Sequence, residues 1–219
     1  METQIEKHLD LLIRRYPVLS VCREDIAKAY DILETCFAGG NKLLVAGNGG
    51  SCADAEHIVG ELMKGFKLPR KISEEFAGKL VSIDAERGAE LAEKLQGGLP
   101  AIALDNHQGL NTAYINDVPN GGLLMYAQQV NGYGSKGDVL LGISTSGNSK
   151  NVMYATVVAR AKGMKVIGLT GEKGGQLAAC ADVAIKVPET ETYMIQELHL
   201  PVYHCLCLML EERFFGLKL

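Results

Sequence analysis

The sequence predicts an α/β fold built on a doubly wound parallel sheet with helices on both faces. Five short apolar runs alternate along the chain with segments of helical period, and polar loops rich in glycine or serine follow two of the runs. Apolar runs of four to eight residues bounded by turn residues are typical of buried parallel strands. Alternating strands and helices place the helices on both faces of one sheet. The runs span residues 42–47, 100–104, 138–143, 165–170 and 182–187.

The composition predicts a single globular domain, 1–219. The chain is 47% hydrophobic and 22% charged, which suffices for a full core, and its net charge of -4 offers no basic surface for a nucleic acid. The charged, amphipathic N-terminus lacks the apolar centre of a secretory signal, and the apolar run Cys205–Leu210 is too short to cross a bilayer. We therefore expect a cytoplasmic protein with no nucleic-acid and no membrane partner.

The six cysteines lie in apolar periodic segments and form no CxxC pair. This pattern predicts reduced, buried thiols rather than disulfides or a thiolate metal site. Cys52 stands where a helix begins, a place where a thiol pKa can fall. We interpret it instead as a small residue behind the loop that precedes it.

Helical spacing predicts the remaining elements in order. Two helices, 3–16 and 22–38, occupy the N-terminal region 1–40, and Gly39-Gly40 ends the second. Residues 67–99 are too many for an αβ loop, which predicts an insertion of one or two amphipathic helices that serves as a lid or a subunit contact. A basic cluster beside it, Lys64 to Lys71, is expected to be solvated. The other predicted helices span 52–66, 109–116, 121–132, 149–162, 174–180 and 192–214.

The first polar loop, Gly47–Ser51, follows the run 42–47 and opens a helix. Glycines allow the backbone to approach an anion, and the free N–H groups of a helix N-terminus favour negative charge. The alternative is a tight turn with Ser51 as the helix cap.

The second polar loop, Ser144–Ser149, also follows a strand and precedes a helix. Its four hydroxyls and its amides can form a cradle that binds phosphate without a lysine, although serine clusters also cap helices. Ligands bind beyond the carboxyl ends of the strands in doubly wound sheets. The two loops together therefore predict a phosphate site.

A set of metal-binding side chains lies on two predicted helices. His57 and Glu61 are four residues apart, so they share a helix face and suit a zinc-type ion, although a surface ion pair has the same spacing. Gln196 and His204 add an amide and an imidazole from the last helix. Those two lie roughly 80° apart on an ideal helix, so a kink at Pro201 or a wide site is needed. His199 shares the face of Gln196 more closely and is the rival of His204.

The motifs GNGGS at 47–51 and STSGNS at 144–149 resemble the SIS (sugar isomerase) family. This resemblance implies a three-layer αβα sandwich with a five-stranded, flavodoxin-like parallel sheet and a phosphosugar ligand. The segments DAEHIVGE at 54–61 and IQELH at 195–199 resemble the phosphoheptose isomerases within that family. That closer resemblance implies zinc held by His57, Glu61, Gln196 and His204.

The same resemblance implies an aldose-ketose isomerisation of sedoheptulose 7-phosphate through an enediol, in a homotetramer or dimer. Glu61 is then the carbon base and His204 its acid/base partner, while the metal stabilises the enediolate. Family members tend to carry an acidic residue where this chain has Tyr193. Two alternatives therefore stay open. The chain could be an isomerase of another phosphosugar, or a non-catalytic SIS-type regulator that binds a phosphosugar or a protein. The implied substrate contacts are Asn48, Gly49, Gly50, Ser51, Asn116, Asp117, Ser144, Thr145, Ser146, Ser149 and Gln196.

Overall fold

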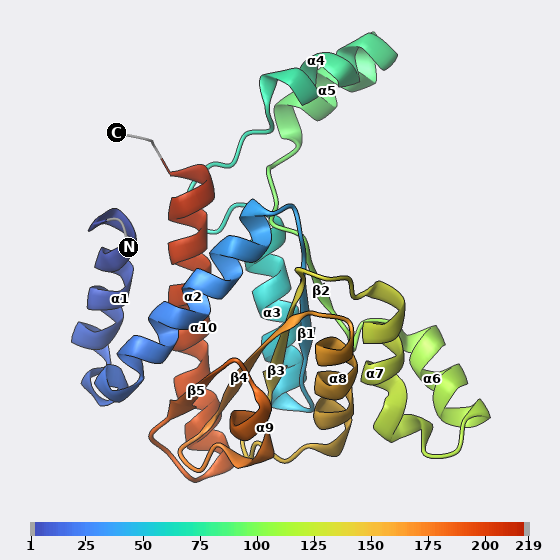
Figure 1. The fold of residues 1–219 in the computed structure, drawn as a ribbon. Coiled ribbons are helices and arrows are strands. Elements are labelled where there is room, and N and C mark those ends of the chain that lie inside the picture. The colour runs from blue at the N-terminus through green and yellow to red at the C-terminus, as the bar shows by residue number, and fades with distance from the viewer. Residues whose placement is uncertain (1–2, 217–219) are drawn as a thin grey trace.

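The computed structural model describes residues 3–216, so both ends of the predicted domain 1–219 lie outside the described residues. Its centre is a five-stranded parallel sheet in the order β2-β1-β3-β4-β5 (Figure 1). This is the flavodoxin-like order, and it confirms the predicted fold class. The strands are β1 (Leu43–Ala46), β2 (Ala101–Ala103), β3 (Val139–Ile143), β4 (Lys165–Gly171) and β5 (Val183–Val187).

Helices cover both faces of the sheet, because successive side chains of each buried strand point to opposite sides. On β1, Leu43 and Val45 belong to one apolar cluster with α2 (Arg23–Ala38), α3 (Gly50–Met63) and α10 (Thr192–Phe215). Leu44 and Ala46 belong to a second cluster on the other face. That face is covered by α7 (Gly121–Tyr133), α8 (Lys150–Ala161) and α9 (Gly175–Cys180), with α6 (Gln108–Asp117) outside α7 (Figure 1).

The N-terminal region has the two predicted helices. α1 (Thr3–Arg15) packs against α10, and a short 3-10 helix, Pro17–Cys22, leads into α2. Val21, in the 3-10 helix, leaves 70% of its surface exposed. Within residues 3–216, no helix is long and apolar enough to cross a membrane.

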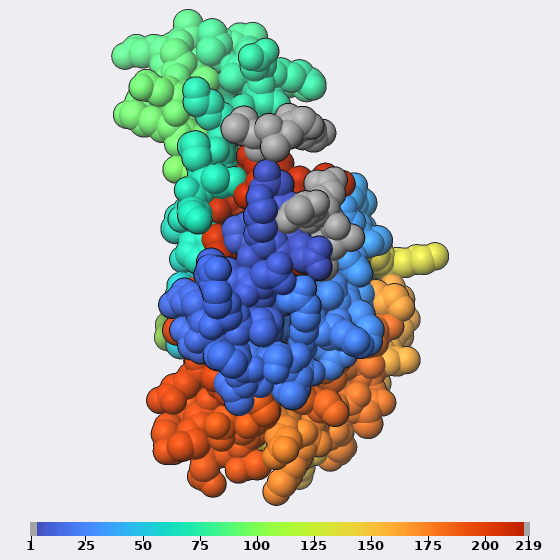
Figure 2. Space-filling view, turned by 90° about the vertical axis from the view of Figure 1, so that its left-hand side faces the viewer, coloured from blue at the N-terminus to red at the C-terminus, as the bar shows by residue number. Residues whose placement is uncertain are grey.

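Residues 67–99 contain the two helices that the sequence predicts, α4 (Glu74–Ile83) and α5 (Ala85–Lys94). They form a hairpin, here called the arm (residues 74–94), that stands away from the body of the molecule (Figures 1 and 2). The arm leaves from the end of α3 opposite the loop 47–51, so it does not cover that loop in its own chain (Figure 1). Its two ends meet at a bridge between Lys71 and Gln96.

One expectation for this region is wrong. Arg70, expected to be solvated with its basic neighbours, is only 2% exposed. Its Nε donates to Glu211 at 2.8 Å, and its other nitrogens donate to the carbonyls of Leu62 and Glu61 at the end of α3. The charge is buried because it pairs with a carboxylate and satisfies carbonyls that a helix end leaves free.

Candidate functional site

The two polar loops lie side by side because β1 and β3 are neighbours in the sheet. The order of the strands reverses between them, and this is the position where doubly wound folds bind ligands. Asn48 of the first loop and Asn151 of α8 join the loops through two reciprocal amide hydrogen bonds of 2.9 and 2.8 Å. Asn151, which the sequence analysis did not single out, therefore fixes the spacing of the loops.

The first loop presents backbone rather than side chains to the solvent. Gly49 has a φ of 57°, a conformation that favours glycine, and Gly50 begins α3. A Cβ at Gly50 would lie 2.5 Å from Nε2 of Gln196, so a larger residue there would displace the Gln196 amide. Ser51 is buried inside the first turn of α3, and the cap position belongs to Gly49, so the alternative of a Ser51 cap is wrong.

The second loop turns its hydroxyls inward toward one another. Ser144 Oγ and Ser149 Oγ are 2.9 Å apart, and the Ser149 side chain makes no capping hydrogen bond to α8 although it precedes that helix. Thr145 is partly buried and Ser146 is exposed. Gly147, with a φ of 65°, packs against the carbonyl of Gly174 and locks the loop. The loop therefore gathers hydroxyl groups at a helix N-terminus, which is suited to a phosphate.

The α3–α10 seam, defined here as the contact between α3 and α10 with residues 64–70, contains the four predicted metal ligands, and three of them form one cluster. The two helices lie side by side (Figure 1), with Gly50 opposite Gln196 and His57 opposite Tyr203. His57 Nε2 lies 3.3 Å from Glu61 Oε1. The ring of His204 stands at 90° to the ring of His57, with 4.9 Å between their centres.

Gln196 is not brought to the other three. Its amide rests on Gly50, seven residues before His57 on α3, which corresponds to about 10 Å along the helix. α10 continues from Thr192 to Phe215 without interruption through Pro201, so it has no break that would bring Gln196 to His204. In this structure Gln196 belongs to the first polar loop.

His204, rather than its rival His199, faces the candidate metal ligands. His199 is wholly buried beside the backbone of Thr170, and burial lowers its pKa to about 4. Burial also lowers the pKa of His204, as does the charge of His57, while Glu61 opposes the shift. Phe66, just after α3, covers the His204 ring at 5.4 Å between ring centres.

The residue types of this cluster are those that a zinc-type ion prefers. Tyr203 Oη donates its single proton to Asp54 Oδ1 at 3.2 Å, so the contact of 3.0 Å between His57 Nδ1 and Tyr203 Oη requires a proton on Nδ1. His57 Nε2 faces the Glu61 carboxylate. His204 Nε2 is buried with no hydrogen-bond partner. Two imidazoles and a carboxylate form a typical set of zinc ligands.

Asn116 and Asp117, the predicted sugar contacts, lie apart from the seam. They are exposed at the C-terminal end of α6, beyond α7 from α10 (Figure 1). Asn116 Nδ2 donates to Asp117 Oδ1 at 2.9 Å. Within this chain the structure does not bring the pair to the candidate metal ligands.

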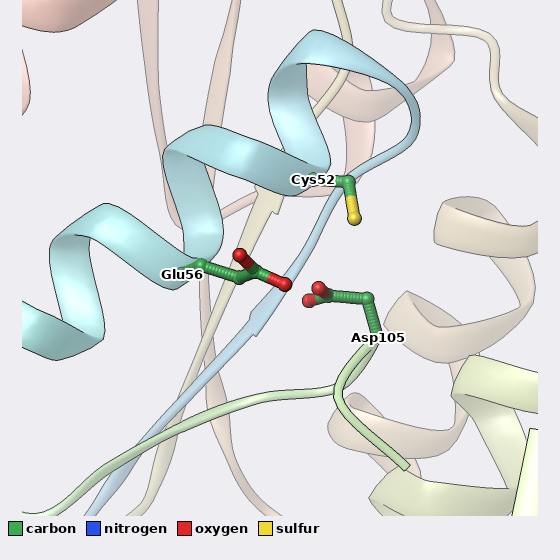
Figure 3. Close-up of side chains that lie close together, drawn as sticks. All are labelled: Cys52, Glu56 and Asp105. Carbon is green, nitrogen blue, oxygen red and sulfur yellow. The ribbon is translucent and has the colours of Figure 1, made fainter. Parts of the chain in front are cut away.

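Sequence reasoning missed a second cluster next to the first loop. Cys52 and Glu56 on α3 and Asp105 after β2 place their donor atoms within 4.8 Å of one another (Figure 3). Burial and a hydrogen bond to Asp105 raise the pKa of Cys52 to about 12, so the thiol is not activated. The spacing of four between Cys52 and Glu56, and the position of Asp105 directly after a strand, are the signals that could have revealed the cluster.

The six cysteines are free, as predicted. Cys22, Cys36, Cys205 and Cys207 are buried, whereas Cys52 and Cys180 are partly exposed. The prediction of buried thiols therefore holds for four of the six and is wrong for Cys52 and Cys180. Burial raises the pKa of all six, so none of them is an activated thiol.

Comparison with known proteins gives consistent matches. The family model of the SIS domain matches residues 17–98 and 85–171. A phosphoheptose isomerase of Geotalea daltonii is 40% identical over 191 residues, 87% of this chain and 85% of the relative. One of Trichlorobacter lovleyi is 36% identical over 98% of this chain and 93% of the relative.

Solved structures agree with these sequence matches. A phosphoheptose isomerase of Neisseria gonorrhoeae has a TM-score of 0.71 and 32% identity, and covers 95% of this chain and 97% of its own. The corresponding structure from Francisella tularensis has a TM-score of 0.73 and 30% identity, over 97% of this chain and 100% of its own.

Proposed function

The chain belongs to the SIS domain family and, within it, to the phosphoheptose isomerases, and from this we propose that it interconverts sedoheptulose 7-phosphate and D-glycero-D-manno-heptose 7-phosphate. The observation that carries the proposal is the seam cluster, in which His57 and Glu61 lie on the helix that starts at the phosphate-type loop and His204 faces them from α10. A non-catalytic phosphosugar-binding protein would need the loops but not this cluster.

The phosphate of the substrate binds to the two polar loops. Backbone N–H groups at the start of α3 and the hydroxyls of the second loop can hold a dianion, and the positive ends of α3 and α8 favour it. The sugar then extends from the loops along the seam toward His57. The residues proposed to bind it are Asn48, Gly49, Gly50, Ser51, Ser144, Thr145, Ser146, Ser149 and Gln196, together with Asn116 and Asp117.

The reaction moves a carbon-bound proton between C1 and C2 while O1 and O2 exchange another. Glu61 removes and returns the carbon-bound proton, and its side chain is only 13% exposed, which protects that proton from exchange with water. His204 passes the second proton between the oxygens. A zinc ion held by His57, Glu61 and His204 would supply a Lewis acid for the enediolate. Gln196, the fourth ligand that the sequence predicts, contacts Gly50 in this structure and is kept only among the proposed substrate contacts.

The remaining parts of the proposal concern assembly and location. We propose a homotetramer or a dimer that uses the N-terminal helices, since Val18 and Val21 expose 46% and 70% of their surface there. We also propose a cytoplasmic location, in keeping with the free cysteines.

The test is turnover of sedoheptulose 7-phosphate by the purified protein, with and without a chelator, beside Glu61→Gln. The variant keeps the size of the side chain and removes the base, so kcat should fall about 10²- to 10⁴-fold. Glu90→Gln, on the exposed surface of the arm, is the matched control and should keep full activity. Absence of turnover in a folded, zinc-loaded sample contradicts the proposal and favours another phosphosugar or a binding function.

A further inference from the structure

Tyr203 is a second residue of α10 that contacts a proposed metal ligand. It contacts His57 at Nδ1, the ring nitrogen that does not face Glu61. It precedes His204 in the chain, is 2% exposed, and packs edge-on against His57 with 5.5 Å between ring centres. α10 thus supplies one candidate ligand directly and contacts another through the neighbouring residue.

A line of hydrogen bonds connects Asp54, Tyr203 and His57. Tyr203 Oη lies 3.2 Å from Asp54 Oδ1 and 3.0 Å from His57 Nδ1. A phenol has one proton and Asp54 accepts it, so Nδ1 of His57 must donate the other hydrogen bond. Its second ring nitrogen, Nε2, is directed to Glu61 and is the nitrogen available to a metal ion.

We propose that Tyr203 and Asp54 are positioning residues, which hold His57 in the Nδ1–H tautomer and orient its Nε2 for the metal. A histidine that binds a metal usually donates its other N–H to a fixed partner, which sets the tautomer and the ring orientation. Here the partner is a tyrosine that the partly buried carboxylate of Asp54 orients in turn. The inference rests on the proposed metal site and adds two residues that the proposed reaction does not itself use.

The experiment measures the Zn²⁺ affinity of the full-length protein by competition with a chromophoric chelator. Tyr203→Phe keeps the ring and its packing but removes the acceptor for Nδ1–H, so the Kd for Zn²⁺ should rise about 10- to 100-fold. The matched control is Tyr126→Phe, which also removes a hydroxyl from a tyrosine that is 2% exposed and donates to a carbonyl, that of Gly47. Its Kd for Zn²⁺ should stay within about threefold of the unmodified protein.

Asp54→Asn provides a second variant if Tyr203→Phe fails to fold. The amide can donate to Tyr203, which frees the phenol to donate to His57 Nδ1 and leaves the proton on Nε2, the wrong tautomer for a ligand. The Kd of this variant for Zn²⁺ should therefore rise as well, and an unchanged Kd contradicts the inference.

The inference is overturned if Tyr203→Phe binds Zn²⁺ as tightly as the unmodified protein, or if Tyr126→Phe loses affinity equally. A protein that binds no Zn²⁺ overturns both the metal site and this inference. A protein whose Zn²⁺ affinity depends on Tyr203, but that does not convert sedoheptulose 7-phosphate, supports the inference and contradicts only the proposed substrate.

Discussion

The α3–α10 seam and the arm are both pairs of packed helices, but different contacts hold them. α3 and α10 are more than a hundred residues apart in the sequence and meet through buried polar groups. α4 and α5 follow one another directly, and α4 has no buried residue. The seam thus depends on long-range contacts, whereas the arm depends on local ones.

The Arg70–Glu211 ion pair is buried in the seam, and its carboxylate accepts hydrogen bonds from several other groups. Glu211 accepts N–H groups from Phe66, Lys67 and Leu68 as well as Nε of Arg70, at distances of 2.8 to 3.1 Å. Burial would raise the pKa of Glu211, but these donors outweigh it and lower the pKa. The pair therefore joins the end of α3, the start of residues 67–99 and α10.

The arm is held by exposed contacts near in sequence. Lys79 pairs with Glu75 and Lys94 with Glu90, each at a spacing of four on its own helix. Asp84 caps α5 by accepting the N–H groups of Glu86 and Arg87. Exposed pairs of this kind each contribute about 0.3–0.5 kcal/mol.

The largest predicted difference between the two regions follows from cutting one ion pair in each. Arg70→Met leaves the Glu211 carboxylate buried without its cation, so the free energy of unfolding should fall by about 3–5 kcal/mol. Lys79→Met cuts an exposed pair of the arm and should cost about 0.5 kcal/mol or less. Urea denaturation measures both, and equal effects would contradict the comparison.

The second prediction is that the free energy of unfolding depends on pH through His199, a histidine of α10. The pKa of His199 is about 4 in the folded protein, below its ordinary value of 6.5, because burial disfavours the charged ring. Between these values the unfolded chain binds the proton and the folded one does not. The free energy of unfolding is therefore unaffected by this group above pH 6.5 and falls as the pH drops from 6.5 toward 4. The slope from this group approaches about 1.4 kcal/mol per pH unit.

Replacing the histidine tests that slope. His199→Gln cannot titrate, so its stability should depend less on pH between 6.5 and 4 in chelator-treated samples. His107→Gln, outside α10, should keep the original dependence. Identical slopes in all three proteins would show that His199 is not the group responsible.

The same contrast explains what the sequence could predict. Strands such as 138–143, and the polar loops that follow strands, are local patterns that can be read from the sequence. The structure has the predicted sheet and both polar loops. It also brings His57, Glu61 and His204 together in the seam. Arg70 gave no such signal, since its partner Glu211 is 141 residues away. The contact of Gln196 with Gly50 was equally hidden, because helix periodicity fixes a face but not the neighbour that the face meets.

The smallest effect should come from removing the whole arm. Residues 72–95 can be replaced by a short Gly-Ser turn, because Lys71 and Gln96 already pair across the gap. Gly88 is the one residue of α4 and α5 that is buried, so the body loses no apolar core, and the free energy of unfolding should change by less than about 1 kcal/mol. Zn²⁺ affinity should also be retained, because His57 and His204 contact no residue of the arm in the interactions that define the site.

A deletion that unfolds the protein would refute the view of 67–99 as an insertion, since the arm would then supply packing to the domain. If the arm deletion is stable and the Arg70→Met protein is unstable, Arg70 belongs to the part of the chain that the domain needs in order to fold, and the arm does not.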